Sequence, residues 1–294
     1  MIGSLEILQV LSKLNYNAPI SPKEDLVYYA TIGGNKDVLE YYIKIGFDNE
    51  KVEDKYDGSL LYHAIFHNKL DSVRVLYEHK FPFKDIKQKL RSLEYYNALE
   101  AALFIGYREP IVYYLVESGE TITARMFQIS VYLVILHPPY LYLAQHISKE
   151  EINKKYNGSH AVHWICGLNR LDIARIILEK GINVNLCNDA GHTAFYYRSD
   201  EFIILQFLEL FSQYGLDVNA QSITNDGKKS NTILADMISV IKIPYKAVEW
   251  LLAHGARTDI YTDILKDTII NYIQRNRNIK IKKLFEKFGH IKNE

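Results

Sequence analysis

The feature that most constrains the fold is a stripe of apolar residues that recurs at fixed distances before a glycine. In residues 173–181, apolar side chains lie eight, seven, four and three positions before Gly181. This spacing puts them on one face of a helix, and the glycine supplies the left-handed conformation that ends it. The same offsets recur before Gly46, Gly119 and Gly255, and weaker copies end at Lys80, Gly215 and Gly289.

The intervals between these helix ends give the period of the repeat. From 46 to 80, from 181 to 215 and from 255 to 289 the interval is 34 residues each time. The intervals from 80 to 119 and from 215 to 255 are 39 and 40, which indicates the same unit with a five- or six-residue insertion. The 62 residues from 119 to 181 are close to two units. A period of about 33 residues is typical of solenoids, in which each helix pair packs on its neighbours.

Composition excludes several other classes of protein. The chain has 294 residues, of which 48% are hydrophobic, too large a share for a disordered chain. Its 35 basic and 35 acidic residues balance, so no net charge steers it toward nucleic acid or an anionic membrane. Cys166 and Cys187 are too few for a disulfide framework, so we expect both to be reduced, as in a cytoplasmic protein.

The apolar segments do not favour a membrane location. The stretch Met1–Leu14 contains Glu6 and lacks a basic leader, so we do not expect a signal peptide. His137-Pro138-Pro139 splits the most apolar run, 131–143, and neither half approaches the ~20 residues that cross a bilayer. We expect a soluble chain.

A second, shorter helix is expected upstream of each apolar stripe. In the best unit, residues 158–166 precede a turn formed by residues 167–170. This unit resembles the ankyrin repeat, whose pattern reads G-x-T-P-L-H-x-A-A, with residues 160–163 (His-Ala-Val-His) in the T, P, L and H places. Residues 178–185 are similar to the family's closing pattern, and further copies begin near residues 57, 97 and 191.

The resemblance covers nearly the whole chain and implies a single ankyrin-repeat domain, residues 1–294. The implied fold class is all-α, an ankyrin-repeat solenoid of about eight helix-turn-helix units with capping ends. We expect these units at approximately 22–50, 51–84, 92–122, 123–153, 154–186, 187–221, 225–259 and 260–290, after an N-terminal cap at 1–21. Segment 120–150 departs most from the pattern, yet its prolines favour a helix pair because they end one helix and start another.

Candidate chemistry in the sequence has structural alternatives that we favour. His160, His163 and Cys166 have a spacing compatible with zinc, but the resemblance makes His163 the helix-start histidine, whose ring bonds backbone in the neighbouring turn. No fourth ligand is near in sequence, so we expect no metal. No phosphate-binding or nucleophile-elbow motif is present, so we expect no cofactor, no catalytic residue and no enzyme.

Two other features have a functional and a structural interpretation. Tyrosine pairs such as Tyr28-Tyr29 and Tyr41-Tyr42 suit an interface, but we favour core filling, with one ring of each pair buried. Residues 265–294 hold eight basic and three acidic side chains, which suits a phosphate or an acidic partner. We favour a solvated face on a capping helix, so nucleic acid is not the expected partner.

The resemblance also implies where a partner protein binds, because turn tips and short inner helices form the concave face of an ankyrin array. Carried over position by position, the partner-binding residues are Lys55, Tyr56, Phe66, His67, Phe104, Ile105, Tyr156, Asn157, Ser159, Leu168 and His192. Phe66, Phe104 and Leu168 are the most informative of these because they are apolar at places that are usually polar.

The first functional hypothesis is therefore a monomeric, non-enzymatic scaffold that binds a partner protein or peptide through this face. The alternative is a host-directed effector or enzyme-accessory protein with a functional site in segment 120–150. The Ile-, Asn-, Lys- and Tyr-rich sequence is similar to ankyrin proteins of large DNA viruses and of bacterial effectors, which would place it in a host cytoplasm. A nucleic-acid binder acting through the C-terminal basic segment is the third hypothesis.

Overall fold

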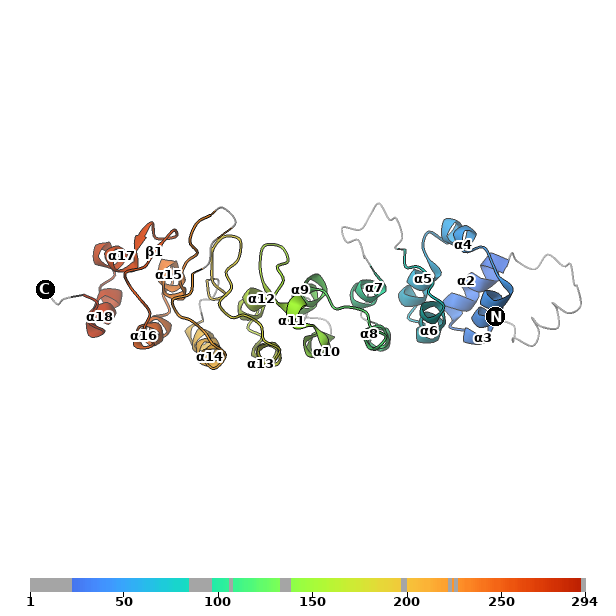
Figure 1. The fold of residues 1–294 in the computed structure, drawn as a ribbon, viewed down its shortest axis with the longest axis horizontal. Helices are drawn as coiled ribbons and strands as arrows, with labels where there is room; N and C mark the ends of the chain where they lie inside the picture. Colours follow the sequence, from blue (N-terminus) through green and yellow to red (C-terminus); the bar gives the residue numbers. More distant parts are fainter. Residues whose placement is uncertain are drawn as a thin grey trace, which may run out of the picture. The chain divides into compact units, whose positions relative to one another are not determined.

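The computed structural model divides the chain into two compact units, Met1–Thr121 (unit 1) and Ile122–Glu294 (unit 2). The structure describes residues 23–84, 97–105, 108–132, 139–196, 200–221, 224 and 227–291. Three expected features lie outside the described residues: the N-terminal cap at 1–21, most of the insertion near 84–95, and Asn225-Asp226. Each unit is a row of helix pairs, each with an inner and an outer helix (Figure 1).

Unit 1 contains three helix pairs within its described residues, and a further helix precedes the second pair. These helices are α2 (Lys23–Gly33), α3 (Lys36–Ile45), α4 (Asn49–Tyr56), α5 (Leu60–Phe66), α6 (Leu70–Glu78), α7 (Ala98–Phe104) and α8 (Glu109–Glu117). The inner helices α2, α5 and α7 pack in that order, and so do the outer helices α3, α6 and α8. Each pair therefore covers the apolar face of its neighbour.

Unit 2 continues the same scheme. Its helices are α9 (Ala124–Tyr132), α10 (Pro139–His146), α11 (Lys149–Ile152), α12 (Ala161–Gly167), α13 (Leu171–Glu179), α14 (Glu201–Ser212), α15 (Ile233–Ser239), α16 (Tyr245–Ala253), α17 (Ile269–Arg275) and α18 (Ile279–Lys287). Helices α9 and α10 flank residues 133–138, which lie outside the described residues, so segment 120–150 contains a helix on each side of this gap.

The apolar stripes that predicted the outer helices are the core of both units. In α13 the stripe residues Ile173, Ala174, Ile177 and Leu178 are all buried. The turns between inner and outer helix have their own signal, because Asn68 and Asn169 adopt the left-handed conformation at φ 56° and 57°. Asparagine tolerates this region better than most residues, so it ends the inner helix without a glycine.

Polar residues at the start of the inner helices satisfy backbone N–H groups. Ser59, Asn97, Thr232 and Thr268 each accept a hydrogen bond from the backbone N–H three residues later. Such a cap stabilises a helix by about 1 kcal/mol, which matters for inner helices of only seven residues. The short inner helices are thus specified by their first residue as well as by burial.

Two details differ from the all-α prediction. First, β1 (Tyr261–Thr262) and β2 (Asp267–Thr268) form a short antiparallel hairpin before α17, in which Lys266 has a left-handed φ of 51°. Buried Thr262 pairs with Asp267 across this hairpin, so the loop folds on itself instead of extending the helix.

Second, unit 187–221 contains no inner helix within its described residues. Residues 194–196 form a turn. The backbone N–H and the hydroxyl of the preceding Thr193 both donate to Asp236 on α15, so a carboxylate of the next repeat holds the chain where the inner helix was expected to begin.

No helix in the described part of the chain is long and apolar enough to cross a bilayer.

Candidate functional site

Aromatic rings line the inner side of unit 1 from α2 to α5. The Tyr28 ring stacks on Tyr56, which ends α4, with centroids 3.6 Å apart and planes 2° from parallel. His63 on α5 meets the edge of the Tyr28 ring at 5.1 Å, and Tyr62 stacks on Phe66 at 6.1 Å. The rings connect the tip of one repeat to the inner helix of the repeat before it.

A polar contact fixes the outer end of this aromatic line. The Tyr56 hydroxyl donates to Asp25 Oδ1 at 2.6 Å, and the Lys55 ammonium group pairs with the same carboxylate. These two hydrogen bonds lower the pKa of Asp25, while burial and the Asp25 carboxylate raise the pKa of Tyr56. Tyr56 therefore remains a neutral donor, and the tip is tied to α2.

Apolar side chains reach the surface at the inner-helix ends of unit 1. Phe66 is 37% exposed at the end of α5, and His67 beside it is also exposed. Arg108 Nη2 donates to the Phe66 carbonyl oxygen at 2.7 Å, which joins this end to the next repeat. Phe104 and Ile105 occupy the same positions at the end of α7 and are half-buried. The structure thus brings four of the predicted residues together at adjacent inner-helix ends.

Unit 2 repeats the arrangement with a tight turn at its tip. Tyr156 and Ser159 exchange backbone hydrogen bonds of 2.9 and 3.1 Å around Asn157, whose φ is 48°. Asn157 projects as the exposed corner, while Tyr156 and Ser159 are half-buried. Leu168, at the position that His67 occupies in unit 1, is 37% exposed directly after α12.

The histidines that suggested a metal are used in backbone contacts. His163 Nε2 donates to the His192 carbonyl oxygen at 3.1 Å, and its Nδ1 accepts from the His160 backbone N–H at 3.3 Å. His160 Nδ1 lies 2.9 Å from the Asn153 carbonyl oxygen, and Cys166 is a buried free thiol. Burial lowers the pKa of His163 to about 4, so its ring is neutral. Within the described residues, no cluster of three potential ligands is placed to bind a metal ion.

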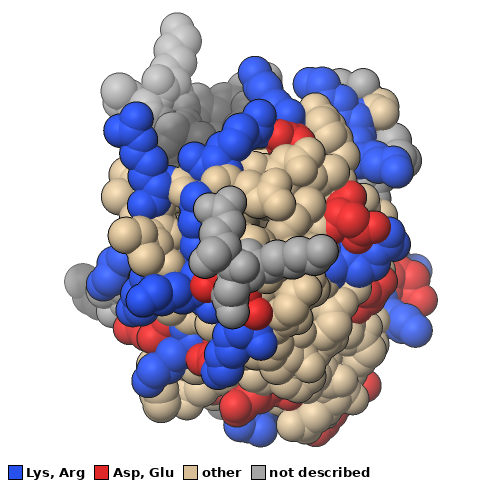
Figure 2. Space-filling model, turned by 90° about the vertical axis from the view of Figure 1, so that its left-hand side faces the viewer, with Lys and Arg blue, Asp and Glu red and all other residues tan. Residues whose placement is uncertain are grey.

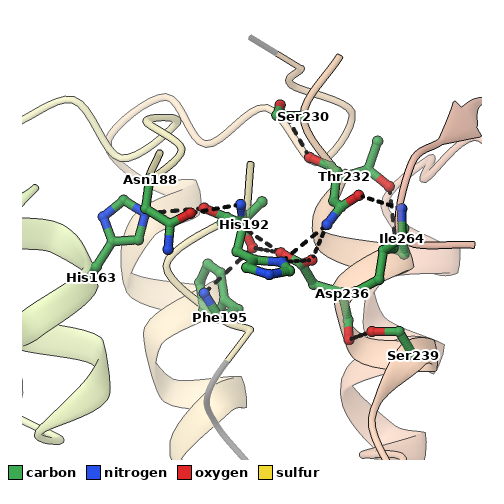
Figure 3. Close-up of polar contacts among 12 residues, drawn as sticks. His163, Asn188, His192, Phe195, Ser230, Thr232, Asp236, Ser239 and Ile264 are labelled. Carbon is green, nitrogen blue, oxygen red and sulfur yellow. Dashed lines mark hydrogen bonds and ion pairs between the residues drawn. The ribbon is translucent and has the colours of Figure 1, made fainter. Parts of the chain in front are cut away.

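A buried polar network lies next to His163 and connects three repeats (Figure 3). Its centre is the carboxylate of Asp236, which is fully buried on α15 and accepts from the Thr193 backbone and hydroxyl at 2.7 Å each. His192 Nδ1 lies 3.2 Å from Asp236 Oδ1, and Asn231 Nδ2 donates to the same oxygen at 2.9 Å. The charge is thus held by four donors from two segments of the chain.

This network defines the role of His192, which the sequence placed among partner-binding residues. Its ring stacks on Tyr196 at 3.5 Å, and its Nδ1 faces Asp236. The Thr193 hydroxyl donates to the carboxylate itself, so it is not placed as a nucleophile activated by the histidine. The contacts of His192 and Thr193 with Asp236 therefore hold this tip against helix α15. A cavity of about 350 Å³ adjoins it, with His192, Asn231 and Asp263 in its wall.

Segment 120–150 shows no comparable cluster in its described residues. His146 is exposed, and its ring bonds the Tyr142 carbonyl oxygen one turn earlier at 2.8 Å. His137 lies outside the described residues. Nothing in the described geometry here places a histidine and a carboxylate against a common cavity.

Sequence reasoning missed Asp236 and Asn231. A signal was present, since Asp236 interrupts an otherwise apolar run, residues 233–238, at a position that the helix buries. An acidic residue at such a position predicts a buried carboxylate that needs donors. Its donors, however, lie up to 44 residues away in sequence, and no local pattern identifies them.

Comparison with known families agrees with this architecture. Residues 157–189, which include the Tyr156–Ser159 turn from Asn157 onward, α12 and α13, match the family model of the ankyrin repeat. These residues therefore form an ankyrin repeat. Further helices, arranged mostly in pairs, precede and follow this matched repeat along the chain.

Two known proteins are similar to longer parts of this chain. Over 200 residues it is 24% identical to a protein named putative palmitoyltransferase ZDHHC13 from Danio rerio. That match covers 65% of this chain and 30% of the relative, so the chain spans less than a third of the relative's length. The crystal structure of the human ASB11 ankyrin repeat domain is 17% identical, with a TM-score of 0.45, over 76% of this chain and 96% of that domain.

Proposed function

We propose that this ankyrin-repeat protein is a non-enzymatic scaffold that binds a partner protein or peptide through its tips and inner-helix ends. The observation that supports this most is the exposure of Phe66 and Leu168. Each is 37% exposed, although nearly every other apolar side chain of α5 and α12 is buried. An apolar side chain left in water at equivalent ends of two inner helices costs free energy unless a partner covers it.

The tips support the same proposal because they are held rigidly. The Tyr28–Tyr56 stack and the Asp25 contacts fix one tip, and the Tyr156–Ser159 turn fixes another. A surface that is already ordered loses little conformational entropy when it binds. Lys55, Asn157 and His67 add exposed polar groups that give such a surface specificity.

The non-enzymatic part of the proposal comes from the chemistry of the described residues. Both cysteines are buried, and the one His–Asp pair described above lies within the inter-repeat network, where the carboxylate accepts four hydrogen bonds. The palmitoyltransferase activity in the name of the Danio rerio relative describes a much longer protein. We propose that the shared part is the repeat scaffold and not the chemistry.

A peptide library displayed on phage tests this proposal. Clones are selected against the full chain and then assayed against Phe66→Glu with Phe104→Glu for unit 1, and against Leu168→Glu for unit 2. We expect clones that bind either surface to lose at least ten-fold in affinity for the matching variant, because a buried carboxylate has no partner there.

Glu117→Ala is the matched control, because it changes an exposed residue on outer helix α8. Selected clones should keep their affinity for it. If every selected clone binds the inner-helix variants as well as the original chain, the assignment of this surface is wrong.

A further inference from the structure

The three most exposed large apolar side chains in the described residues lie in three consecutive repeats of unit 2. Phe202 on α14 is 70% exposed, Ile279 at the start of α18 is 69% exposed, and Ile241 before α16 is fully exposed. All three lie where the chain enters an outer helix, away from the tips and the ends of the inner helices. A single exposed apolar residue is ordinary, so the groove matters only where such side chains share one surface.

Two of these residues line a common groove. A cavity of about 590 Å³ has Phe202, Ile241 and Pro244 in its wall, together with Tyr245 and Lys280. Ile279 directly precedes Lys280 in the sequence but is not itself part of this wall. Phe202 and Ile241 therefore share one apolar surface, which we name the junction groove.

Lysines surround the junction groove, and its acidic residues are already used. Asp200 accepts from two backbone N–H groups of α14, and Glu201 accepts from the backbone N–H of Lys246. Lys242, Lys246 and Lys280 are exposed on the wall, and the Lys280 ammonium lies 3.8 Å from the Tyr245 ring centroid. Three lysines face two carboxylates in this wall, so its net charge is positive.

Two of these lysines occupy a position where acidic residues are typical of this chain. The second residue of the outer helices α3, α6 and α13 is Asp37, Asp71 and Asp172 respectively, which suits the positive end of a helix dipole. In α16 and α18 the same position is Lys246 and Lys280. A lysine at this position destabilises the helix because its charge repels the positive end of the helix dipole. A carboxylate from a bound partner would offset the charge of the lysine and that of the helix end.

Basic side chains are also frequent around the C-terminal end of unit 2. Figure 2 shows lysine and arginine side chains spread across this end, with fewer acidic side chains between them. Two of the arginine and lysine residues of α17 and α18 are paired, Arg275 with Asp267 and Lys287 with Glu249. The remaining positive charge would attract an acidic segment toward the groove before contact.

We propose that the junction groove binds an acidic amphipathic segment of a partner protein. The apolar side chains of that segment cover Phe202 and Ile241, and its carboxylates pair with Lys242, Lys246 and Lys280. The concave wall and its volume favour an inserted peptide over a flat lipid surface, to which two side chains would add little area. This surface is distinct from the tips and inner-helix ends of the proposed scaffold function.

Fluorescence anisotropy with synthetic peptides tests this proposal. The probe is a labelled 15-residue helical peptide with Leu at positions i, i+3, i+4 and i+7 and Glu at most others. Its comparisons are the same peptide with Lys in place of Glu, and a scrambled Glu peptide. We expect the Glu peptide to bind at least ten-fold more tightly than either, with an affinity that falls as salt rises.

Variants of the full chain connect that binding to the groove. We expect Phe202→Ser with Ile241→Ser to weaken the Glu peptide at least ten-fold. Lys242→Glu with Lys246→Glu and Lys280→Glu should reverse the preference, so that the Lys peptide binds more tightly. Tyr214→Ser, just after the end of α14, and Lys44→Glu on α3 are matched controls and should leave the affinities unchanged.

Three outcomes would overturn the proposal: equal binding of the scrambled peptide, unchanged affinity of the groove variants, or groove-dependent sedimentation with phosphatidylserine vesicles in place of peptide binding. The Phe66, Phe104 and Leu168 variants should keep full affinity for the Glu peptide. Failure of the groove and failure of the scaffold surface are therefore separate results.

Discussion

The two units join consecutive repeats by different means. In unit 2, three asparagines each clamp the following repeat. Asn185 Nδ2 donates to the Gly215 carbonyl oxygen at 2.9 Å, and its Oδ1 accepts from the Asp217 N–H at 2.9 Å. Asn153 and Asn219 make the same pair of contacts one repeat before and one repeat after. These clamps form a ladder along the loops of unit 2.

Unit 1 has other residues at the matching positions. Four residues after Gly46 and after Lys80, where Asn185 follows Gly181, the sequence has Glu50 and Lys84. Lys84 exchanges hydrogen bonds with Ser59 and pairs with Glu53, so it holds a tip to its own repeat. The connection between repeats at the first tip comes from the Tyr28–Tyr56 stack together with the contacts of Lys55 and Tyr56 to Asp25. Unit 1 thus joins these repeats by stacked rings and contacts to one carboxylate, whereas unit 2 uses a ladder of asparagine side chains.

The comparison predicts that unit 2 is the more sensitive to loss of one polar group, and Asp236→Ala is the largest expected effect. The change leaves Thr193 and Asn231 donors without their acceptor in a dry site, which we expect to cost about 4 kcal/mol of unfolding free energy. Both tryptophans, Trp164 and Trp250, lie in unit 2, so urea unfolding followed by tryptophan fluorescence reports this unit. Asp259→Ala, which removes an exposed carboxylate paired with Arg257, should change stability by less than about 0.5 kcal/mol.

The second prediction concerns the stability of unit 2 at acidic pH, because His163 in this unit is neutral and buried. Its pKa is about 4 in the folded chain and 6.5 in the reference state, so protons bind the unfolded chain first as the pH falls. His163 therefore contributes full stability above pH 6.5, and this is lost between pH 6.5 and 4, by an order of 3 kcal/mol. Burial also lowers the pKa of His160, which adds loss of the same sign.

His163→Phe isolates this contribution. The variant lacks the titrating ring, so its unfolding free energy should fall less steeply than that of the original chain between pH 6.5 and 4. Parallel slopes for the two proteins in tryptophan-detected unfolding would show that other groups cause the acid sensitivity of unit 2.

The sequence predicts the outer helices because the pattern that specifies each of them lies within a few consecutive residues. The stripe of Ile173, Ala174, Ile177 and Leu178 specifies a buried helical face by spacing alone, and His163 bonds backbone in the next turn as the family resemblance implied. The role of Asp236 and the missing inner helix near Thr193 depend on one contact across 43 residues. Periodicity carries no information on such a contact, because either partner alone resembles an ordinary polar residue.

The exposed residues of the two candidate surfaces also differ in whether the sequence predicts them. Phe66 and Leu168 were predicted because a repeat position is normally polar there. Phe202 and Ile241 were not, because α14 begins four residues earlier relative to its closing glycine than α13 does, and the α15–α16 loop is irregular. Departures from the period conceal the junction groove from an analysis that relies on the period.

The third prediction tests the asparagine ladder directly. Asn185→Ala removes two inter-repeat hydrogen bonds and leaves the Gly215 carbonyl oxygen to water, so we expect a loss of about 1–2 kcal/mol. The matching change in unit 1, Glu50→Ala, alters an exposed side chain and should be neutral within about 0.5 kcal/mol. Unfolding monitored by circular dichroism gives the change in unfolding free energy for each variant. Equal changes for the two variants would remove the distinction between the units.

The smallest expected effect tests the aromatic connection of unit 1. Tyr56→Phe keeps the ring stacked on Tyr28 but deletes the hydroxyl that donates to Asp25, while Lys55 still pairs with that carboxylate. We expect a loss of about 0.5–1 kcal/mol, because one hydrogen bond to a charged group is replaced by water. Amide hydrogen exchange should accelerate in α4 and in the first turn of α2, with the tryptophan-detected unfolding of unit 2 unchanged. If Tyr56→Phe also shifts the unfolding of unit 2, the two units unfold as one cooperative body. The different connections of the two units would then not be measurable as separate contributions to stability.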